Sequence, residues 1–264
     1  MGRLSNRNCI VTGGARGIGM AIGDGLLREG ANVAYADKDD GVVAVAAEAK
    51  HRVGSASGQA IGVKVDVTDR KQVQAAIKAT VAAFGSVNVV FNNAGMNKPM
   101  NFLDVSEENW NTIMTINGLG VLIGMQEAAK QMIAQGTGGK IINTASIAGR
   151  QGYENIAPYC ASKFAVISLT QSGARALAAH NITVNGFAPG VVATPLWEQL
   201  DKDLMALGVS KRPGEAMENF AAGILRGRAA KPEDIAGTTT FLASRDSDYM
   251  TGQIIMIDGG MVLI

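Results

Sequence analysis

Short apolar runs alternate along the chain with longer helical segments, and this alternation limits what the chain can fold into. Several runs are apolar at every position, which is typical of parallel strands covered on both faces. We expect strands at 9–12, 32–35, 60–65, 88–91, 140–143, 182–186 and 254–257. We expect helices at 17–29, 39–52, 69–84, 107–135, 157–179 and 232–243. Repeated β-α-β units with right-handed crossovers predict an α/β protein, a doubly wound Rossmann fold with a seven-stranded parallel sheet and helices on both faces.

The composition excludes several classes of protein. Apolar residues make up 47% of the chain, enough for a large core, and 24 basic residues nearly balance 23 acidic ones. No basic stripe indicates a nucleic-acid partner, and no apolar run approaches the ~20 residues of a membrane span. The two cysteines, Cys9 and Cys160, indicate neither a disulfide framework nor a metal site. We therefore expect a cytoplasmic protein with no metal and no membrane contact.

A glycine-rich turn, TGGARGIG, joins the first expected strand to the first expected helix. Its glycines, Gly13, Gly17 and Gly19, allow a tight turn and a close approach of the backbone to a pyrophosphate. The helix N-terminus that follows offers N–H groups and the positive end of its dipole. The spacing G-x-x-x-G-x-G differs from that of larger dinucleotide-binding domains, and such a turn can also be purely structural. Its place between strand and helix favours dinucleotide binding, with Arg16 and Ile18 as further contacts.

Carboxylates follow the second and third expected strands. Asp37 lies near the distance from the glycine turn at which an acid accepts hydrogen bonds from the adenosine ribose, and it would repel a 2′-phosphate. This favours NAD, although Arg16 and Lys38 could neutralise such a phosphate and Asp37 could be a solvated turn residue. Asp66 and Val67 are expected near the adenine, but the same residues would also suit a bare helix start.

Tyr159 and Lys163 are four residues apart, one helical turn on the same face, and Ser146 precedes them at the end of an expected strand. A phenol with a pKa of about 10 is a poor base at neutral pH. A neighbouring ammonium and an oxidised nicotinamide ring, both positive, would stabilise the phenolate and lower that pKa. Ser146 would hydrogen-bond the substrate oxygen. The grouping therefore predicts proton transfer coupled to hydride transfer with NAD.

With these motifs in place, the sequence resembles the short-chain dehydrogenase/reductases over essentially its whole length. The resemblance implies that Asn117 holds a water in a proton relay with Lys163, and that Tyr159 and Lys163 also contact the cofactor. It implies further cofactor contacts near the adenosine ribose, at Asn93, Ala94 and Gly95. Others are implied near the nicotinamide, at Pro189, Gly190, Val192 and Thr194. It also implies a homotetramer.

Within that family, stretches such as GKIIN at 139–143 and the C-terminal IDGGM resemble bacterial acetoin reductases (butanediol dehydrogenases), and YCA at 159–161 resembles sorbitol and polyol dehydrogenases. These relatives oxidise secondary alcohols with a neighbouring hydroxyl, so a diol or polyol such as butanediol or sorbitol is the expected substrate. One departure favours a more apolar alcohol, because Ile147 stands where such relatives often have Gln. The expected substrate pocket consists of Ser146, Ile147, Tyr153, Tyr159 and Trp197.

The stretch 191–231 breaks the alternating pattern, and we interpret it as a substrate lid within one domain spanning 1–264. A fixed pair of helices that contacts another subunit is the alternative. The apolar wall of the lid is expected from Leu196, Trp197, Leu200, Met205 and Met217. Its charged residues are expected to face solvent, namely Glu198, Asp201, Lys202 and Asp203.

Two other functions fit part of the pattern. An NADP-dependent 3-ketoacyl reductase would share the fold and the catalytic residues, and Asp37 argues against it. A non-catalytic dinucleotide sensor would need the glycine turn but not Ser146, Tyr159 and Lys163 together.

Overall fold

The computed structural model describes residues 2–54 and 58–263. A parallel sheet of seven strands lies at its centre, in the order β3-β2-β1-β4-β5-β6-β7. The strands are Asn8–Thr12 (β1), Asn32–Asp37 (β2), Ala60–Lys64 (β3), Val89–Asn92 (β4), Gly139–Thr144 (β5), Ile182–Pro189 (β6) and Ile254–Ile257 (β7). The strand order reverses between β1 and β4, and in such sheets ligands bind at the carboxyl ends of the strands beside that point. The predicted fold class is confirmed.

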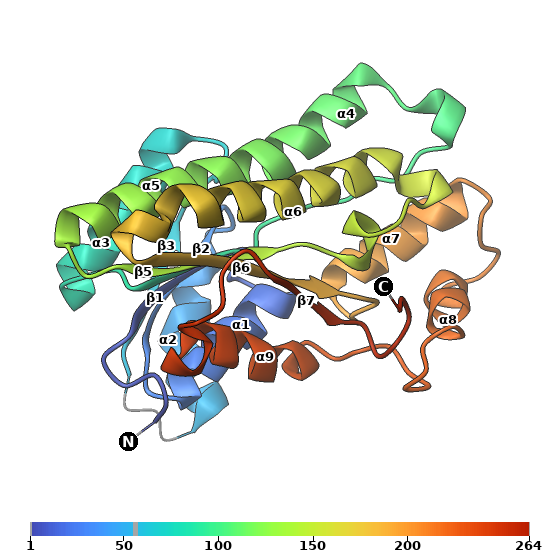
Figure 1. The fold of residues 1–264 in the computed structure, drawn as a ribbon. Helices are drawn as coiled ribbons and strands as arrows, with labels where there is room; N and C mark the ends of the chain where they lie inside the picture. Colours follow the sequence, from blue (N-terminus) through green and yellow to red (C-terminus); the bar gives the residue numbers. More distant parts are fainter. Residues whose placement is uncertain (1, 55–57, 264) are drawn as a thin grey trace.

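Helices cover both faces of the sheet. They are Gly17–Arg28 (α1), Val42–Val53 (α2), Arg70–Phe84 (α3), Glu107–Met114 (α4), Gly120–Gln135 (α5), Ala157–Leu177 (α6), Pro195–Ala206 (α7), Glu215–Ala221 (α8) and Glu233–Ala243 (α9). Helices α3, α5 and α6 cover one face, and α1, α2 and α9 cover the other (Figure 1). An apolar cluster fills each interface, one around Met132 and Ile141, the other around Tyr35 and Phe91.

The expected helix 107–135 is divided in two. Helices α4 and α5 are joined by a π-helical turn, Thr115–Leu119, that contains Asn117. A π turn adds one residue to the helical repeat without ending the helix, so the apolar periodicity predicted the helix but not its division.

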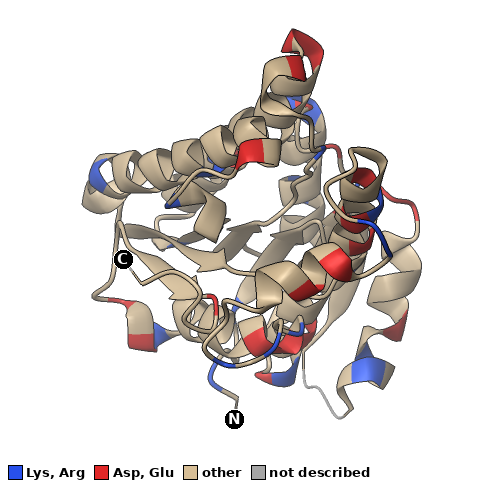
Figure 2. Ribbon diagram, turned by 90° about the vertical axis from the view of Figure 1, so that its right-hand side faces the viewer, with Lys and Arg blue, Asp and Glu red and all other residues tan. Residues whose placement is uncertain are grey.

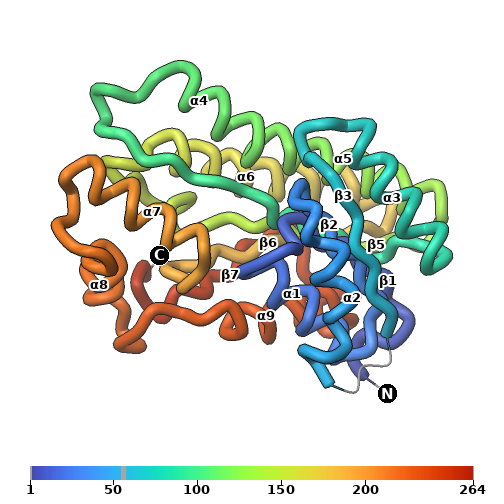
Figure 3. Tube along the Cα trace, turned by 180° about the vertical axis from the view of Figure 1, so that it is seen from behind, coloured from blue at the N-terminus to red at the C-terminus, as the bar shows by residue number. Residues whose placement is uncertain are grey.

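The stretch 191–231, which interrupts the alternating pattern, contains helices α7 and α8. They lie together beyond the end of β6, beside the carboxyl edge of the sheet, and the view from behind shows the same arrangement (Figures 1 and 3). Pro195 is the first residue of α7, where a missing N–H costs nothing. The chain therefore leaves the sheet at Pro189, forms α7 and α8 beside the carboxyl edge, and then continues into α9.

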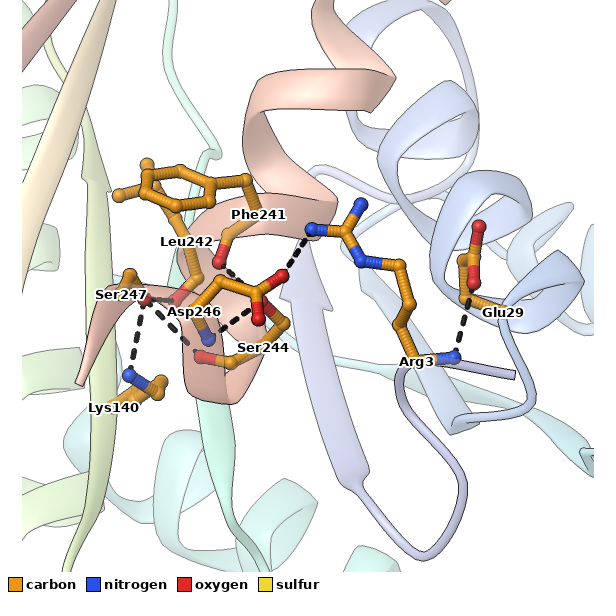
Figure 4. A network of polar contacts seen from close by, with 8 residues as sticks. All are labelled: Arg3, Glu29, Lys140, Phe241, Leu242, Ser244, Asp246 and Ser247. Carbon is orange, nitrogen blue, oxygen red and sulfur yellow. Dashed lines mark hydrogen bonds and ion pairs between the residues drawn. The ribbon is translucent and has the colours of Figure 1, made fainter. Parts of the chain in front are cut away.

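A polar network at the opposite edge joins the segment before β1 to the turn after α9 (Figure 4). Arg3 pairs with Asp246, just after α9, and its backbone N–H donates to Glu29 after α1. The buried Lys140 of β5 donates to Ser247 over 3.1 Å and pairs with Asp248 over 2.7 Å. The polar side chains of this network, at the amino edge of the sheet, thus make structural contacts with one another.

The surface carries both signs of charge. Acidic and basic residues occur on several elements of the side shown in Figure 2. Within residues 2–54 and 58–263, no helix is both long and apolar enough to cross a membrane.

Candidate active site

A cavity of about 510 Å³ lies along the carboxyl edge of the sheet. Its walls come from the glycine turn, from the ends of β2 to β6, and from the start of α7. All residues predicted to bind the cofactor line it: Gly13, Arg16, Gly17, Ile18, Gly19, Asp37, Asp66, Val67, Asn93, Ala94, Gly95, Tyr159, Lys163, Pro189, Gly190, Val192 and Thr194. The structure therefore brings these residues, predicted from separate motifs, into one site.

The glycine turn has the close geometry that a pyrophosphate needs. Gly13 has a φ of +66°, and a Cβ on Gly19 would lie 2.0 Å from the carbonyl oxygen of Gly13. Asn93 fixes the turn, because its Nδ2 donates to the carbonyl of Thr12 over 2.9 Å. Among the described residues no side chain caps the N-terminus of α1, so its first amides are available to an anion.

The carboxylate of Asp37 is held at the end of β2. Its Oδ2 accepts from the backbone N–H of Ala15 over 3.0 Å, and its Oδ1 accepts from that of Asp39 over 3.1 Å. Arg16 and Lys38 line the same cavity with exposed side chains. The negative charge is thus fixed against the glycine turn, whereas the two cations are exposed.

Asp66 lines the cavity with a carboxylate that is already partly engaged. Its Oδ1 accepts from both the backbone N–H and the hydroxyl of Thr68, over 2.9 and 2.7 Å. These bonds shape the turn between β3 and α3. The alternative interpretation, in which Asp66 supports the start of a helix, therefore describes part of what this side chain does.

Ser146, Tyr159 and Lys163 lie together where β5 and α6 meet the cavity. The Ser146 hydroxyl accepts from the N–H of Ala148 over 3.1 Å, and Ser146 and Tyr159 line the cavity together. Lys163 Nζ donates to the carbonyl of Thr144 over 2.7 Å and lies 5.6 Å from the centre of the Tyr159 ring. Three side chains capable of moving a proton thus share one end of the cavity.

Burial shifts the pKa of both ionisable members of this group. Burial raises the pKa of Tyr159 to about 12, although the nearby Ser146 hydroxyl acts in the opposite direction. Burial lowers the pKa of Lys163 to about 8. Burial thus shifts the pKa of Tyr159 upward, whereas the sequence predicts a lowered pKa. The predicted lowering requires the oxidised nicotinamide as a second positive charge.

Asn117 lies behind the cavity and does not line it. Its Oδ1 accepts from the N–H of Met96 and its Nδ2 donates to the carbonyl of Met96, both over 2.9 Å. Nδ2 also donates to the Ser162 hydroxyl over 3.1 Å. The side chain is fully buried and positions the cavity-lining Met96, and the role of Asn117 in a proton relay stays a prediction.

A second cavity, of about 410 Å³, adjoins the first. Both are lined by Ser146 and Tyr159, which therefore stand at their junction. All residues predicted for the substrate pocket line this second cavity: Ser146, Ile147, Tyr153, Tyr159 and Trp197.

The stretch 191–231 departs from prediction at several residues. Met205 and Met217 do not line the cavity, whereas Leu204, Val209 and Phe220 do. Asp201 is 8% exposed and its Oδ2 accepts from the N–H of Gly214 over 2.7 Å, so its predicted solvent position is wrong.

Helical spacing explains this error. Asp201 is four residues after Trp197 and therefore shares its inward face. The same spacing, through Leu200 and Leu204, could have identified the cavity-facing residues of α7. Asn97 and Phe220 also line the cavity, and no motif in the sequence indicated them.

Comparison with known proteins identifies a matching family and several similar proteins. The family model described as enoyl-(acyl carrier protein) reductase matches residues 13–262. Diacetyl reductase [(S)-acetoin forming] of Staphylococcus epidermidis is 39% identical, over 97% of this chain and 99% of its own. Galactitol 2-dehydrogenase of Agrobacterium fabrum is 42% identical over 98% of both chains. The crystal structure of levodione reductase matches with a TM-score of 0.90 at 32% identity, over 97% of this chain and 98% of the other.

Proposed function

The chain is an oxidoreductase of the short-chain dehydrogenase/reductase family, and from that premise we propose that it interconverts a secondary alcohol and its ketone with NAD, using Tyr159 as acid and base. The observation that carries the proposal is the position of Ser146 and Tyr159 at the junction of the two cavities, with Lys163 beside Tyr159 in the first. A substrate in the second cavity would meet a cofactor in the first at these residues.

The residues of this chain would move the proton and hold the substrate. In the oxidation, Tyr159 takes the proton from the alcohol O–H as the carbon–oxygen double bond forms, and in the reduction it returns the proton. Ser146 donates a hydrogen bond to the substrate oxygen while charge develops on it. Lys163 supports the phenolate electrostatically. The nicotinamide cofactor, when bound, accepts or supplies the hydride.

The fit of a dinucleotide rests on the glycine turn and on Asp37. A turn too close for side chains, followed by an uncapped helix N-terminus, suits the pyrophosphate. The family implies NAD or NADP, and the fixed carboxylate of Asp37 supports NAD. It can accept from a ribose hydroxyl, and it would repel a 2′-phosphate.

The substrate class predicted from the sequence is a diol or polyol. Two relatives support that class, because they are named for diacetyl and for galactitol. These two compounds differ in size. The common element is a secondary alcohol or ketone, which is all that Ser146 and Tyr159 require.

A comparison of cofactors and substrates tests the proposal. Purified protein is assayed for oxidation of NADH and NADPH with diacetyl, acetoin and acetophenone. We expect reduction of at least one ketone, with kcat/KM for NADH roughly ten-fold or more above that for NADPH. Preference for NADPH would contradict the role of Asp37. Binding of NAD without turnover of any ketone or alcohol would instead support a dinucleotide sensor.

A further inference from the structure

The second cavity has more room than a small diol needs. A water molecule occupies about 30 Å³ in the liquid, and at a similar volume per non-hydrogen atom a four-carbon diol would fill roughly 180 Å³. The cavity measures about 410 Å³. More than half of it would remain open behind such a substrate.

One wall of the cavity is formed by aromatic and aliphatic side chains from three segments. Phe220 of α8 lies between Trp197 of α7 and Tyr153, with ring centres 5.5 and 5.8 Å away. Leu200 and Leu204 are buried and pack with Ala216 beneath this wall. An apolar or aromatic group of a substrate would find dispersion contacts and edge-to-face partners here.

Polar partners are few along this wall. The Tyr153 hydroxyl accepts from Gln151 Nε2 over 2.8 Å and keeps its own O–H to donate, and Asn155 Nδ2 donates to Glu154. Asn97 also lines the cavity, and its buried Oδ1 has no partner among the described residues. Ile147 is buried and offers no hydrogen bond. Hydroxyl groups of a polyol placed against Ile147 or Phe220 would lose water without replacement, which is costly.

The cavity also lacks a counter-ion for an acidic substrate. Of its described lining residues none is lysine or arginine, and Glu154 is the one carboxylate. A carboxylate or phosphate placed there would be desolvated without a positive partner. The substrate that fits is uncharged.

We propose, on the basis of the dehydrogenase function proposed above, that the substrate is an uncharged secondary alcohol or ketone whose reacting carbon bears a bulky apolar group, such as an aryl or alicyclic ring. The ring occupies the space between Ile147 and the wall formed by Tyr153, Trp197 and Phe220. Phe220 and Trp197 then determine selectivity, and small diols and polyols are poor substrates.

The test compares 1-phenylethanol with 2,3-butanediol, two secondary alcohols that share a methyl group on the reacting carbon. Burial of a phenyl-sized group predicts a kcat/KM with NAD roughly ten-fold to hundred-fold higher for 1-phenylethanol. A smaller ratio, or preference for 2,3-butanediol or sorbitol, overturns the substrate class while leaving the dehydrogenase function standing. Absence of turnover with every alcohol and both cofactors overturns the proposed function itself.

Variants of the wall locate the selectivity. Phe220→Ala should lower kcat/KM for 1-phenylethanol at least ten-fold and change that for 2,3-butanediol less than about three-fold. Met217→Ala is the matched control, because Met217 lies on the same helix and does not line the cavity. Equal losses on both alcohols, or the same effect in the control, would show a structural role and overturn the assignment of Phe220.

A binding measurement separates recognition from chemistry. In the Tyr159→Phe variant saturated with NADH, Phe220→Ala should weaken the binding of acetophenone roughly ten-fold or more, measured by calorimetry. Unchanged binding would contradict the proposed contact with the ring.

Discussion

Lys163 is kept in the site at a cost to stability. Its ammonium is buried and donates to the carbonyl of Thr144, and no described residue forms an ion pair with it. Burial lowers its pKa to about 8, from an ordinary value near 10.5. The charged form is therefore less favourable in the folded protein than in the unfolded chain.

This shift predicts how stability depends on pH. Below pH 8 both states hold the proton and the penalty is complete. Between about pH 8 and 10.5 only the unfolded chain holds it, so stability rises with pH. Relative to Lys163→Met, the wild type should gain about 2 kcal/mol in the free energy of unfolding between pH 7 and pH 10. Urea unfolding of both proteins at the two pH values checks this, and parallel pH profiles would contradict it.

The charge of Asp37 can be separated from its hydrogen bonds. Asp37→Asn keeps an oxygen that can accept from Ala15 and removes the charge that repels a 2′-phosphate. We expect the ratio of kcat/KM for NADPH to that for NADH to rise roughly ten-fold. A matched Asp39→Asn variant, in the same turn, should leave the ratio unchanged. If Asp37→Asn does not alter it, Arg16 and Lys38 control the choice of cofactor.

At the residue scale, sequence motifs located the lining of the first cavity and part of the second. The glycine turn and the Tyr159–Lys163 spacing are local patterns with a direct chemical meaning. Phe220 and Asn97 belong to no such pattern, because their place in the cavity depends on how α8 and the segment after β4 pack. The direction of the Tyr159 pKa shift also depends on burial, which local spacing does not encode.

At the element scale, Asp201 joins the two helices of the stretch proposed as a lid. Its Oδ2 accepts from the N–H of Gly214, the residue that precedes α8, and α8 carries Phe220. Asp201→Ala would leave that N–H without its partner, which costs about 1–3 kcal/mol when the group is buried.

We therefore expect Asp201→Ala to raise KM for the alcohol several-fold and to speed amide hydrogen exchange in α8, with NAD affinity unchanged. Lys202→Ala, exposed on the same helix, serves as the control. Equal loss of NAD affinity, or unchanged exchange in α8, would contradict a local role of Asp201 in the lid.

Some helices and strands can be predicted from the sequence more accurately than others. The glycine turn and strong apolar periodicity predicted α1 and most strands within a few residues. In α7, the charge of Asp201 predicts a solvent position, whereas its spacing from Trp197 places it on the inward face. The π turn cannot be predicted from periodicity, because it preserves the helical pattern on either side.

At the scale of the whole molecule, exposed apolar side chains suggest assembly. Trp110 of α4 is 43% exposed, Phe164 of α6 is 47% exposed, and Leu263 near the C-terminus is 80% exposed. Burial of such groups against symmetry mates would be favourable, and we predict a homotetramer. Sedimentation velocity at micromolar concentration should give a single tetramer boundary, whereas a monomer would contradict the prediction.

The doubly wound parallel sheet followed from general rules, because consecutive β-α-β units with right-handed crossovers leave few arrangements. The position of α7 and α8 beside the carboxyl edge did not follow from those rules. That position, which encloses the second cavity, is set by contacts such as those of Trp197 with Phe220.

The role of Tyr159 is the central claim, and one variant tests it most directly. Tyr159→Phe removes the hydroxyl that carries the proton and leaves the ring that lines both cavities. We predict that kcat falls at least hundred-fold, as expected for loss of a general acid and base, while the dissociation constant for NAD changes less than about three-fold. Retention of more than roughly a tenth of the wild-type kcat would show that another group moves the proton.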